Sequence, residues 1–240
     1  MKRAALAAVS ALSLAAALTA CSGNDSDTDA KSTASPSAST STSTAKKQVG
    51  PEERLARLVV TKADISGYTF KAPTKGDALA ASQDEMRVDK AACTQLAYAM
   101  NELPIGEPEA SLTRVAHNST TMGTYVTLAT YADGKAETAM KELSKAAASC
   151  AGGFTAKSGA GATTYTSATA EPAPSVGDQS VAAAATFQYR GAQTVRTQTF
   201  RFGDTIVNYF TIDGSAFVYG RPGSAKIPAD LVKAQNAKLG

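Results

Sequence analysis

Three cysteines and one histidine are the side chains with the most reactive chemistry in this sequence: Cys21, Cys93, Cys150 and His117. A single histidine nearly excludes a Ser/His/Asp triad and a zinc centre built on several histidines. His117 borders a predicted turn, where a histidine is usually a polar surface residue. The chemistry of the cysteines depends on the compartment, because disulfides form and persist outside the cytoplasm.

The first twenty residues have the order of charge, apolar core and small residues that is typical of a secretory signal. Lys2 and Arg3 precede an apolar segment over residues 4–20, which is mostly alanine and is interrupted by Ser10, Ser13 and Thr19. A permanent transmembrane helix needs about 20 strongly apolar residues. We therefore predict that residues 1–20 are a signal peptide that is removed.

Cys21 stands where a signal peptidase would cut. The tetrapeptide Leu18-Thr19-Ala20-Cys21 resembles the lipobox of bacterial lipoproteins. That resemblance implies a diacylglycerol on the Cys21 thiol, which would hold the chain stably at the outer face of a cell membrane. The alternative is an ordinary secretory signal followed by an incidental cysteine.

Residues 21–50 continue as a tether of Ser, Thr, Ala, Asp and Lys with almost no large apolar side chain. Such a segment buries too little surface to offset its chain entropy, so we predict disorder. A random coil of this length spans on the order of 30 Å. The remaining residues, 51–240, are enough for one extracytoplasmic domain with a substantial core.

Charge argues against a nucleic-acid partner. The chain has a formal net charge of +3, and Lys2 and Arg3 of the signal segment account for two of these charges. No clustered basic stripe of the kind that binds nucleic acid is visible in the rest.

Cys93 and Cys150 are the two cysteines left in the predicted domain. An even number of cysteines in an exported domain predicts a disulfide between them. The alternative is a catalytic cysteine, which the export compartment disfavours.

Four segments have helical spacing of apolar residues together with capping or stop signals. The clearest follows Asp133, where alanine, methionine and leucine recur at i, i+3, i+4 and i+7. The predicted helices cover residues 51–59, 90–101 (capped by Asp89), 134–149 and 228–239.

Alternating segments rich in Val, Thr and aromatic residues predict strands separated by short turns. They cover residues 67–70, 111–117, 122–131, 163–170, 182–190, 193–202, 205–213 and 215–219. The last four form an antiparallel meander, and residues 111–131 a hairpin. Together these elements predict an α+β fold: an antiparallel β-sheet with helices packed on one face.

Arg190, Arg196 and Arg201 fall in or beside adjacent predicted strands. Alternation places Arg196 on one sheet face and Arg201 on the other. The simpler interpretation is an exposed polar sheet face, and the functional one is a polar lining for a ligand groove. No close pair of carboxylates and no metal-ligating cluster stands out, and we expect no cofactor.

The order of motifs along residues 55–238 resembles that of actinobacterial lipoproteins and of the extracellular sensor domain of PknH-type kinases. The motifs are Leu55-x-x-Leu58, Thr61-x-x-Asp64-x-x-Gly67-Tyr68, Cys93, a helix ending over Leu143 to Cys150, Gly177-Asp178 and Arg201-x-Gly203-Asp204-x-Ile206-Val207. The resemblance implies an antiparallel sheet with helices and a cleft that binds an extracellular ligand.

The sequence thus predicts a non-enzymatic ligand-binding or sensor-like module that is anchored to the membrane outside the cytoplasm. Its predicted partner is an unidentified small-molecule or cell-wall ligand. Two alternatives remain open. A cell-envelope hydrolase would bring distant carboxylates together in a groove. A structural or protein-interaction lipoprotein would show an exposed apolar patch.

Overall fold

The computed structural model describes residues 49–74, 76, 78–118 and 123–240. The predicted signal peptide, Cys21 and nearly all of the predicted tether lie outside these residues, as does most of the predicted turn between the strands of the first hairpin. Regular structure in the described part begins at Pro51, where a proline followed by Glu52 and Glu53 opens a helix.

Ten strands in the described part of the chain join one sheet, in the order β1-β3-β4-β9-β8-β7-β6-β5-β2, with β10 beside β8. Neighbours along this path are antiparallel, and β10 is parallel to β8. The strands are β1 Thr69–Lys71, β2 Arg87–Val88, β3 Ala110–His117, β4 Thr124–Thr130, β5 Phe154–Ser158, β6 Gly161–Glu171, β7 Gln179–Gln188, β8 Ala192–Phe202, β9 Thr205–Thr211 and β10 Gly223–Ser224.

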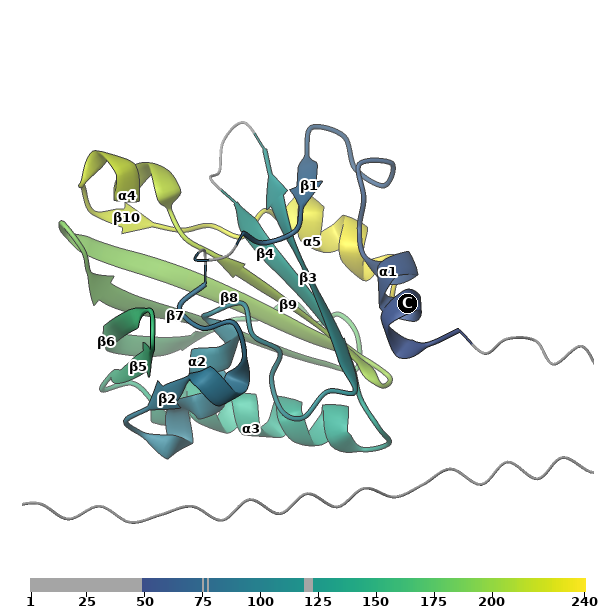
Figure 1. The fold of residues 1–240 in the computed structure, drawn as a ribbon, viewed down its shortest axis with the longest axis horizontal. Coiled ribbons are helices and arrows are strands. Elements are labelled where there is room, and N and C mark those ends of the chain that lie inside the picture. Colours follow the sequence, from purple (N-terminus) through teal and green to yellow (C-terminus); the bar gives the residue numbers. More distant parts are fainter. Residues whose placement is uncertain (1–48, 75, 77, 119–122) are drawn as a thin grey trace, which may run out of the picture. The chain divides into compact units, whose positions relative to one another are not determined.

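Helices cover both faces of this sheet (Figure 1). They are α1 Pro51–Leu58, α2 Thr94–Ala99, α3 Lys135–Ser149, α4 Gly214–Tyr219 and α5 Ala229–Asn236, with 3-10 turns at Gln83–Glu85 and Ala91–Cys93. The α2 and α3 helices pack on one face, through side chains such as Leu96 and Leu143. The α1 and α5 helices pack on the other, through Leu55 and Leu231.

The α+β antiparallel class is confirmed, but the helices are not restricted to one face as predicted. The reason lies in the central strands. Every residue of β9 is buried, with Ile206 and Phe210 in one core and Val207 and Tyr209 in the other. A strand that is apolar on both faces must be covered on both faces.

Residues 215–219, predicted as the last strand of the meander, form helix α4 instead. The Asp213 side chain caps this helix by accepting a hydrogen bond from the Ala216 N–H at 3.0 Å. The helix ends at Gly220, whose φ of 61° suits the left-handed end of a helix. Local capping therefore outweighed a short alternating pattern.

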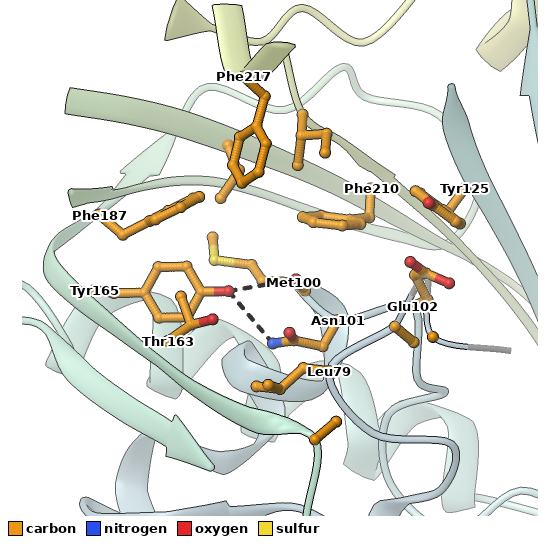
Figure 2. A pocket seen from close by; sticks show the side chains of 15 residues that line it. Leu79, Met100, Asn101, Glu102, Tyr125, Thr163, Tyr165, Phe187, Phe210 and Phe217 are labelled. Carbon is orange, nitrogen blue, oxygen red and sulfur yellow. Dashed lines mark hydrogen bonds between the residues drawn. The ribbon is translucent and has the colours of Figure 1, made fainter. Parts of the chain in front are cut away.

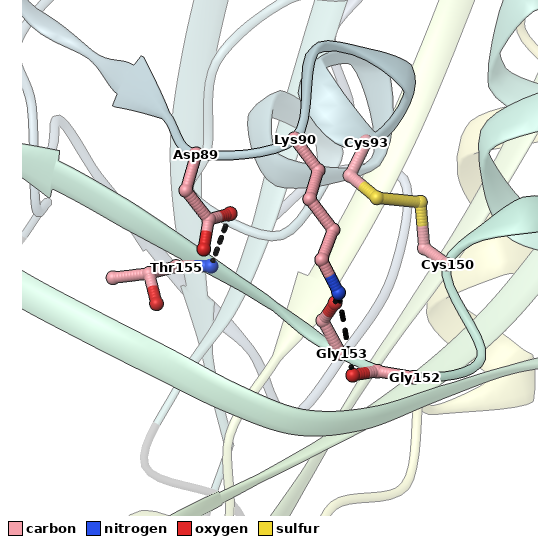
Figure 3. Close-up of a disulfide and its surroundings, with 7 residues drawn as sticks. All are labelled: Asp89, Lys90, Cys93, Cys150, Gly152, Gly153 and Thr155. Atoms are coloured by element: carbon pink, nitrogen blue, oxygen red, sulfur yellow. Dashed lines mark hydrogen bonds between the residues drawn. A yellow bond between two sulfur atoms is a disulfide. The ribbon is translucent and has the colours of Figure 1, made fainter.

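The helix predicted over residues 90–101 is shorter than expected. It comprises one 3-10 turn and α2, because Asp89 does not cap it. The Asp89 carboxylate instead accepts a hydrogen bond from the backbone N–H of Thr155 at 2.8 Å, in strand β5 (Figure 3). This bond also keeps the pKa of the Asp89 carboxyl below its usual value. The side chain that was predicted to cap the helix is therefore bound to strand β5 instead.

Cys93 and Cys150 form the predicted disulfide, which ties the start of α2 to the end of α3 (Figure 3). The chain then turns through Gly152 and Gly153. At Gly153 the φ is 73°, and a Cβ would lie 2.1 Å from the Tyr165 carbonyl oxygen. Lys90 Nζ donates to the Gly153 carbonyl at 2.5 Å. This tight turn leads directly into β5.

No described helix is both long enough and apolar enough to cross a membrane.

Candidate functional site

One face of the sheet carries a row of side chains from five neighbouring strands that line a cavity. Strands β4, β9, β8, β7 and β6 contribute Tyr125, Phe210, Val195, Phe187 and Tyr165. Cross-strand register places Tyr125 opposite Phe210 and Tyr165 opposite Phe187. The rings contact each other at centroid distances of 5.8 Å and 5.9 Å. Such tilted and edge-on contacts favour a fixed arrangement of the rings.

The opposite wall of this cavity comes from the end of α2 and from α4 (Figure 2). Met100, Asn101 and Glu102 follow α2 directly, and Leu79 comes from the segment before β2. The Phe217 ring of α4 lies over the Phe187 side of the cavity and stacks on Tyr189 at 4.0 Å. The cavity has a volume of about 290 Å³. We call it the aromatic pocket.

Two polar side chains are fixed at the base of the aromatic pocket. Asn101 Nδ2 donates to the Ala97 carbonyl at 2.7 Å and approaches the Tyr165 hydroxyl at 3.4 Å. Burial raises the pKa of Tyr165 to about 12, so its hydroxyl keeps its proton at neutral pH. The pocket therefore offers a fixed amide and a fixed hydroxyl beside its aromatic rings.

Glu102 brings a carboxylate to the Tyr125 and Phe210 end of the aromatic pocket (Figure 2). Its φ of 65° is unusual for a residue other than glycine, and it is buried. A left-handed conformation costs about 1–2 kcal/mol for an L-residue. Thr127 Oγ1 donates to the Glu102 carbonyl at 2.9 Å and helps to hold it. Strained residues of this kind concentrate at functional sites.

A buried asparagine on β9 holds the wall formed by α2. Asn208 Nδ2 donates to the Ala99 carbonyl at 2.8 Å, immediately before the pocket residue Met100. Its Oδ1 accepts bonds from Thr197 at 2.5 Å and Thr199 at 2.7 Å on β8. This network joins the end of α2 to two central strands and so fixes the position of Met100.

A second cavity, of about 610 Å³, lies on the other face of the sheet, beside the α5 helix. Ile212, at the end of β9, lines both cavities. Most of the residues that line the second cavity have polar side chains, and we call it the polar pocket. Its polar side chains include Tyr68, Asn118, Asp213, Ser224, Lys226 and Asp230.

The structure does not bring the three predicted arginines together. Arg196 lies on the polar-pocket face and is held by Glu171 at 3.0 Å and by Ser224 Oγ at 2.9 Å. Arg201 points to the opposite face, where it contacts Gln179 and Asp178. Arg190 is at the β7–β8 turn beside the Tyr189 ring. Their role in ligand binding stays a prediction, and of the three only Arg196 touches a residue of the polar pocket.

The sequence reasoning missed the aromatic pocket. A signal was present, because the strands containing Tyr125, Tyr165, Phe187 and Phe210 each bring a large ring to the same sheet face. His117 ends β3 and pairs with Thr69 in register. Among the described residues, no three His, Cys, Asp or Glu side chains gather in a way that could hold a metal ion.

The fold and pocket define an α+β domain with a long antiparallel sheet and an aromatic-lined cavity on one face. Among solved structures, the chain is similar to the extracellular domain of PknH from Mycobacterium tuberculosis, with a TM-score of 0.50 and 13% identity over 80% of this chain and 95% of that chain. It also matches an uncharacterized protein from Mycobacterium smegmatis, an Rv0999 ortholog, with a TM-score of 0.36 and 11% identity over 78% of this chain and 95% of that one.

The likeness to the PknH domain confirms the fold that the sequence resemblance implied. No protein-family model matches the sequence, and a comparison with curated proteins finds no match.

Proposed function

We propose that this chain is a non-enzymatic ligand-binding or sensing module, held at the outer face of the cell membrane by a lipid on Cys21. The observation that carries the proposal is the aromatic pocket, whose walls come from five strands, from helix α4 and from the segment after α2, and whose amide and hydroxyl groups are fixed in advance. The fold of a kinase extracellular domain supports it, as does the signal-like order of residues 1–20.

The aromatic pocket suits a small ligand with a flat apolar group. Its volume is at the lower end for ligand sites. Its walls combine aromatic rings and aliphatic side chains with the polar groups of Asn101, Glu102 and Thr163. A ring ligand would make tilted contacts with Phe187, Phe210 and Phe217. A single polar group on the ligand would meet Asn101 or the Tyr165 hydroxyl.

Indole is a suitable probe, because the chain has no tryptophan and fluorescence from indole excited beyond the tyrosine band reports the probe alone. We expect the full chain, extracted in detergent, to bind indole with a Kd on the order of 1 mM or tighter. Phe217→Ala should weaken binding about tenfold, because it removes one aromatic wall.

Phe202→Ala is the matched control, since Phe202 is also half-buried but packs in the core on the other face. Its indole affinity should equal that of the unchanged chain. Equal affinity in both variants, or no binding by the unchanged chain, would contradict the aromatic pocket as the ligand site.

The lipid anchor is tested at Cys21. We expect mass spectrometry of the chain isolated from its own cell envelope to find an N-terminal peptide that begins at Cys21 and carries a diacylglycerol. Cys21→Ser should move the protein from the membrane fraction to the soluble fraction. Cys93→Ala is the control cysteine variant and should stay with the membrane. An unmodified Cys21 in the membrane fraction would disprove the anchor.

A hydrolase has one observation in its favour, because Asp213 and Asp230 line the same polar pocket. Glycoside hydrolysis requires one carboxyl with a raised pKa to protonate the leaving group. The Ala216 N–H, however, donates to Asp213 and keeps the pKa of that carboxyl below its usual value. Asp213 is therefore unsuited to the acid role, and we favour binding because the preformed aromatic pocket is the stronger observation.

A further inference from the structure

The polar pocket is built from parts of the chain that are far apart in sequence. Tyr68 precedes β1, Asn118 follows β3, Asp213 begins α4, Ser224 ends β10 and Asp230 lies in the first turn of α5. Its volume of about 610 Å³ is within the usual range for small-molecule sites.

A chain of hydrogen bonds fixes one wall of the polar pocket. Asn118 Nδ2 donates to the Tyr68 hydroxyl at 3.1 Å, and that hydroxyl donates to Asp230 Oδ1 at 3.0 Å. The Leu231 N–H donates to the same Oδ1 at 2.9 Å. Burial raises the pKa of Tyr68, so the phenol stays a donor. Both of the last two bonds reach Oδ1 of Asp230, which lines the polar pocket.

The facing wall is held against the sheet by side chains of β8. Arg196 Nη1 donates to Ser224 Oγ at 2.9 Å and to the Ala225 carbonyl at 2.5 Å, while its Nε bonds Glu171. Gln193 Nε2 donates to the Arg221 carbonyl at 2.8 Å. Arg196 is thus a positioning residue for this wall.

Close packing at Gly223 adds to this rigidity. A Cβ there would lie 2.5 Å from the Ala216 Cβ and 3.1 Å from the Asp213 Cβ. The loop that carries Ser224 therefore lies directly against the start of α4. Both polar walls are fixed before any ligand arrives, and such preorganisation favours binding.

We propose that the polar pocket binds a neutral, hydroxyl-rich small molecule, in chemical terms a sugar. Asp213 and Asp230 provide acceptors for ligand hydroxyls, and Lys226 provides a donor. The Ser224 hydroxyl accepts from Arg196 and keeps its own proton to donate to a ligand. Ile212, Ala225 and Pro228 offer apolar surface for the carbon face of a sugar ring. This site shares Ile212 with the aromatic pocket but lies on the other face of the sheet, and the proposal does not depend on the function assigned there.

The charges favour a neutral ligand over an ionic one. Two carboxylates would repel a phosphate. The Lys226 ammonium lies among the same lining residues and offsets part of that negative charge, so a cation gains less than it would beside the carboxylates alone. A hydroxyl group can both donate and accept, so hydroxyls suit the donors and the acceptors of this pocket together, which an ammonium or a fully ionised phosphate group does not.

The test uses the full chain in a detergent without a sugar headgroup, with saturation-transfer NMR and titration of glucose and N-acetylglucosamine. We expect saturation transfer to both sugars, and weaker transfer to glucosamine and glucose 6-phosphate. Asp230→Asn should weaken sugar binding at least about tenfold, because it removes a charged acceptor. Lys226→Met should weaken it about threefold or more, and this exposed residue carries little risk of unfolding the chain.

Asp133→Asn and Lys233→Met make the same chemical changes at exposed positions that do not line the polar pocket. Both should bind sugar as the unchanged chain does. Comparing N-acetylglucosamine with its trimer separates the two sources of such a ligand. The single sugar should bind more tightly if the natural ligand is a free sugar, and the trimer should bind more tightly if it is the end of a wall polymer.

Three binding results would overturn the proposal. They are no transfer to any neutral sugar, equal binding in the Lys226 variant and its control, or tighter binding of glucosamine than of glucose. Hydrolysis of the trimer would also overturn it, because the pocket would then be catalytic. Binding of indole at the aromatic pocket is a separate measurement, so the two proposals fail independently.

Discussion

Replacing both cysteines of the disulfide, in Cys93→Ala/Cys150→Ala, is expected to lower the free energy of unfolding by about 4 kcal/mol. The two cysteines are separated by 57 residues along the chain. Without the cross-link the unfolded chain gains the entropy of that open loop, while the folded chain keeps its packing. Both side chains are buried between α2 and α3, so alanine removes little other than the sulfur atoms. Chemical denaturation of the full chain, followed by far-UV circular dichroism, measures this difference.

The matched control is the unchanged chain in a strong reductant. Reduction should destabilise it to about the same extent, and the double variant should not respond to the reductant. If the double variant unfolds at the same denaturant concentration as the oxidised chain, the disulfide contributes no stability and the loop-entropy argument is wrong.

The disulfide could be predicted from the sequence because the prediction needs only an export signal and an even number of cysteines in the exported domain. The helix over residues 135–149 was equally accessible, since Ala136, Met140 and Leu143 repeat along one face and all are buried. Strands β7, β8 and β9 could also be predicted, because short turns separate long alternating segments. In each case the signal is local or compositional.

Features decided by distant contacts could not be predicted in this way. Asp89 has the residue type and position of a helix cap, but its carboxylate accepts a hydrogen bond from the Thr155 N–H in β5. The placement of helices on both faces depends on which strands become central, and that follows from the sheet order. Helix α4 could have been predicted, because Asp213 before a glycine and a serine is a typical helix-capping signal. The short alternating pattern of residues 215–219 was interpreted as a strand instead.

The candidate sites show the same limit. Strand alternation correctly placed Arg196 and Arg201 on opposite faces, but it could not show that Glu171 and Ser224 hold the Arg196 guanidinium. The aromatic pocket requires the register of five strands, which the turns alone do not determine. Single residues could be assigned to faces, whereas a cavity could be assigned only from the assembled sheet.

Asn208→Ala is expected to lower the free energy of unfolding by about 4 kcal/mol and to weaken indole binding in the aromatic pocket. The substitution leaves the hydroxyls of Thr197 and Thr199 without their acceptor and the Ala99 carbonyl without its donor, all in the buried space between α2 and the sheet. The carbonyl adjoins the pocket wall, so Met100 should shift when that bond is lost. Denaturant titration and indole fluorescence measure the two effects on one sample.

Asn236→Ala provides the matched comparison, because Asn236 is also buried but its described side-chain bond is a single one, from the Tyr209 hydroxyl at 2.8 Å. It lies on the other face, so it should cost about 1–2 kcal/mol and leave indole binding unchanged. The triple variant Asn208→Leu/Thr197→Val/Thr199→Val should recover much of the lost stability, since no orphaned hydroxyl remains. If Asn208→Ala costs no more than Asn236→Ala, the Asn208 network does not hold α2 against the sheet, and the wall of the aromatic pocket must be held by apolar packing alone.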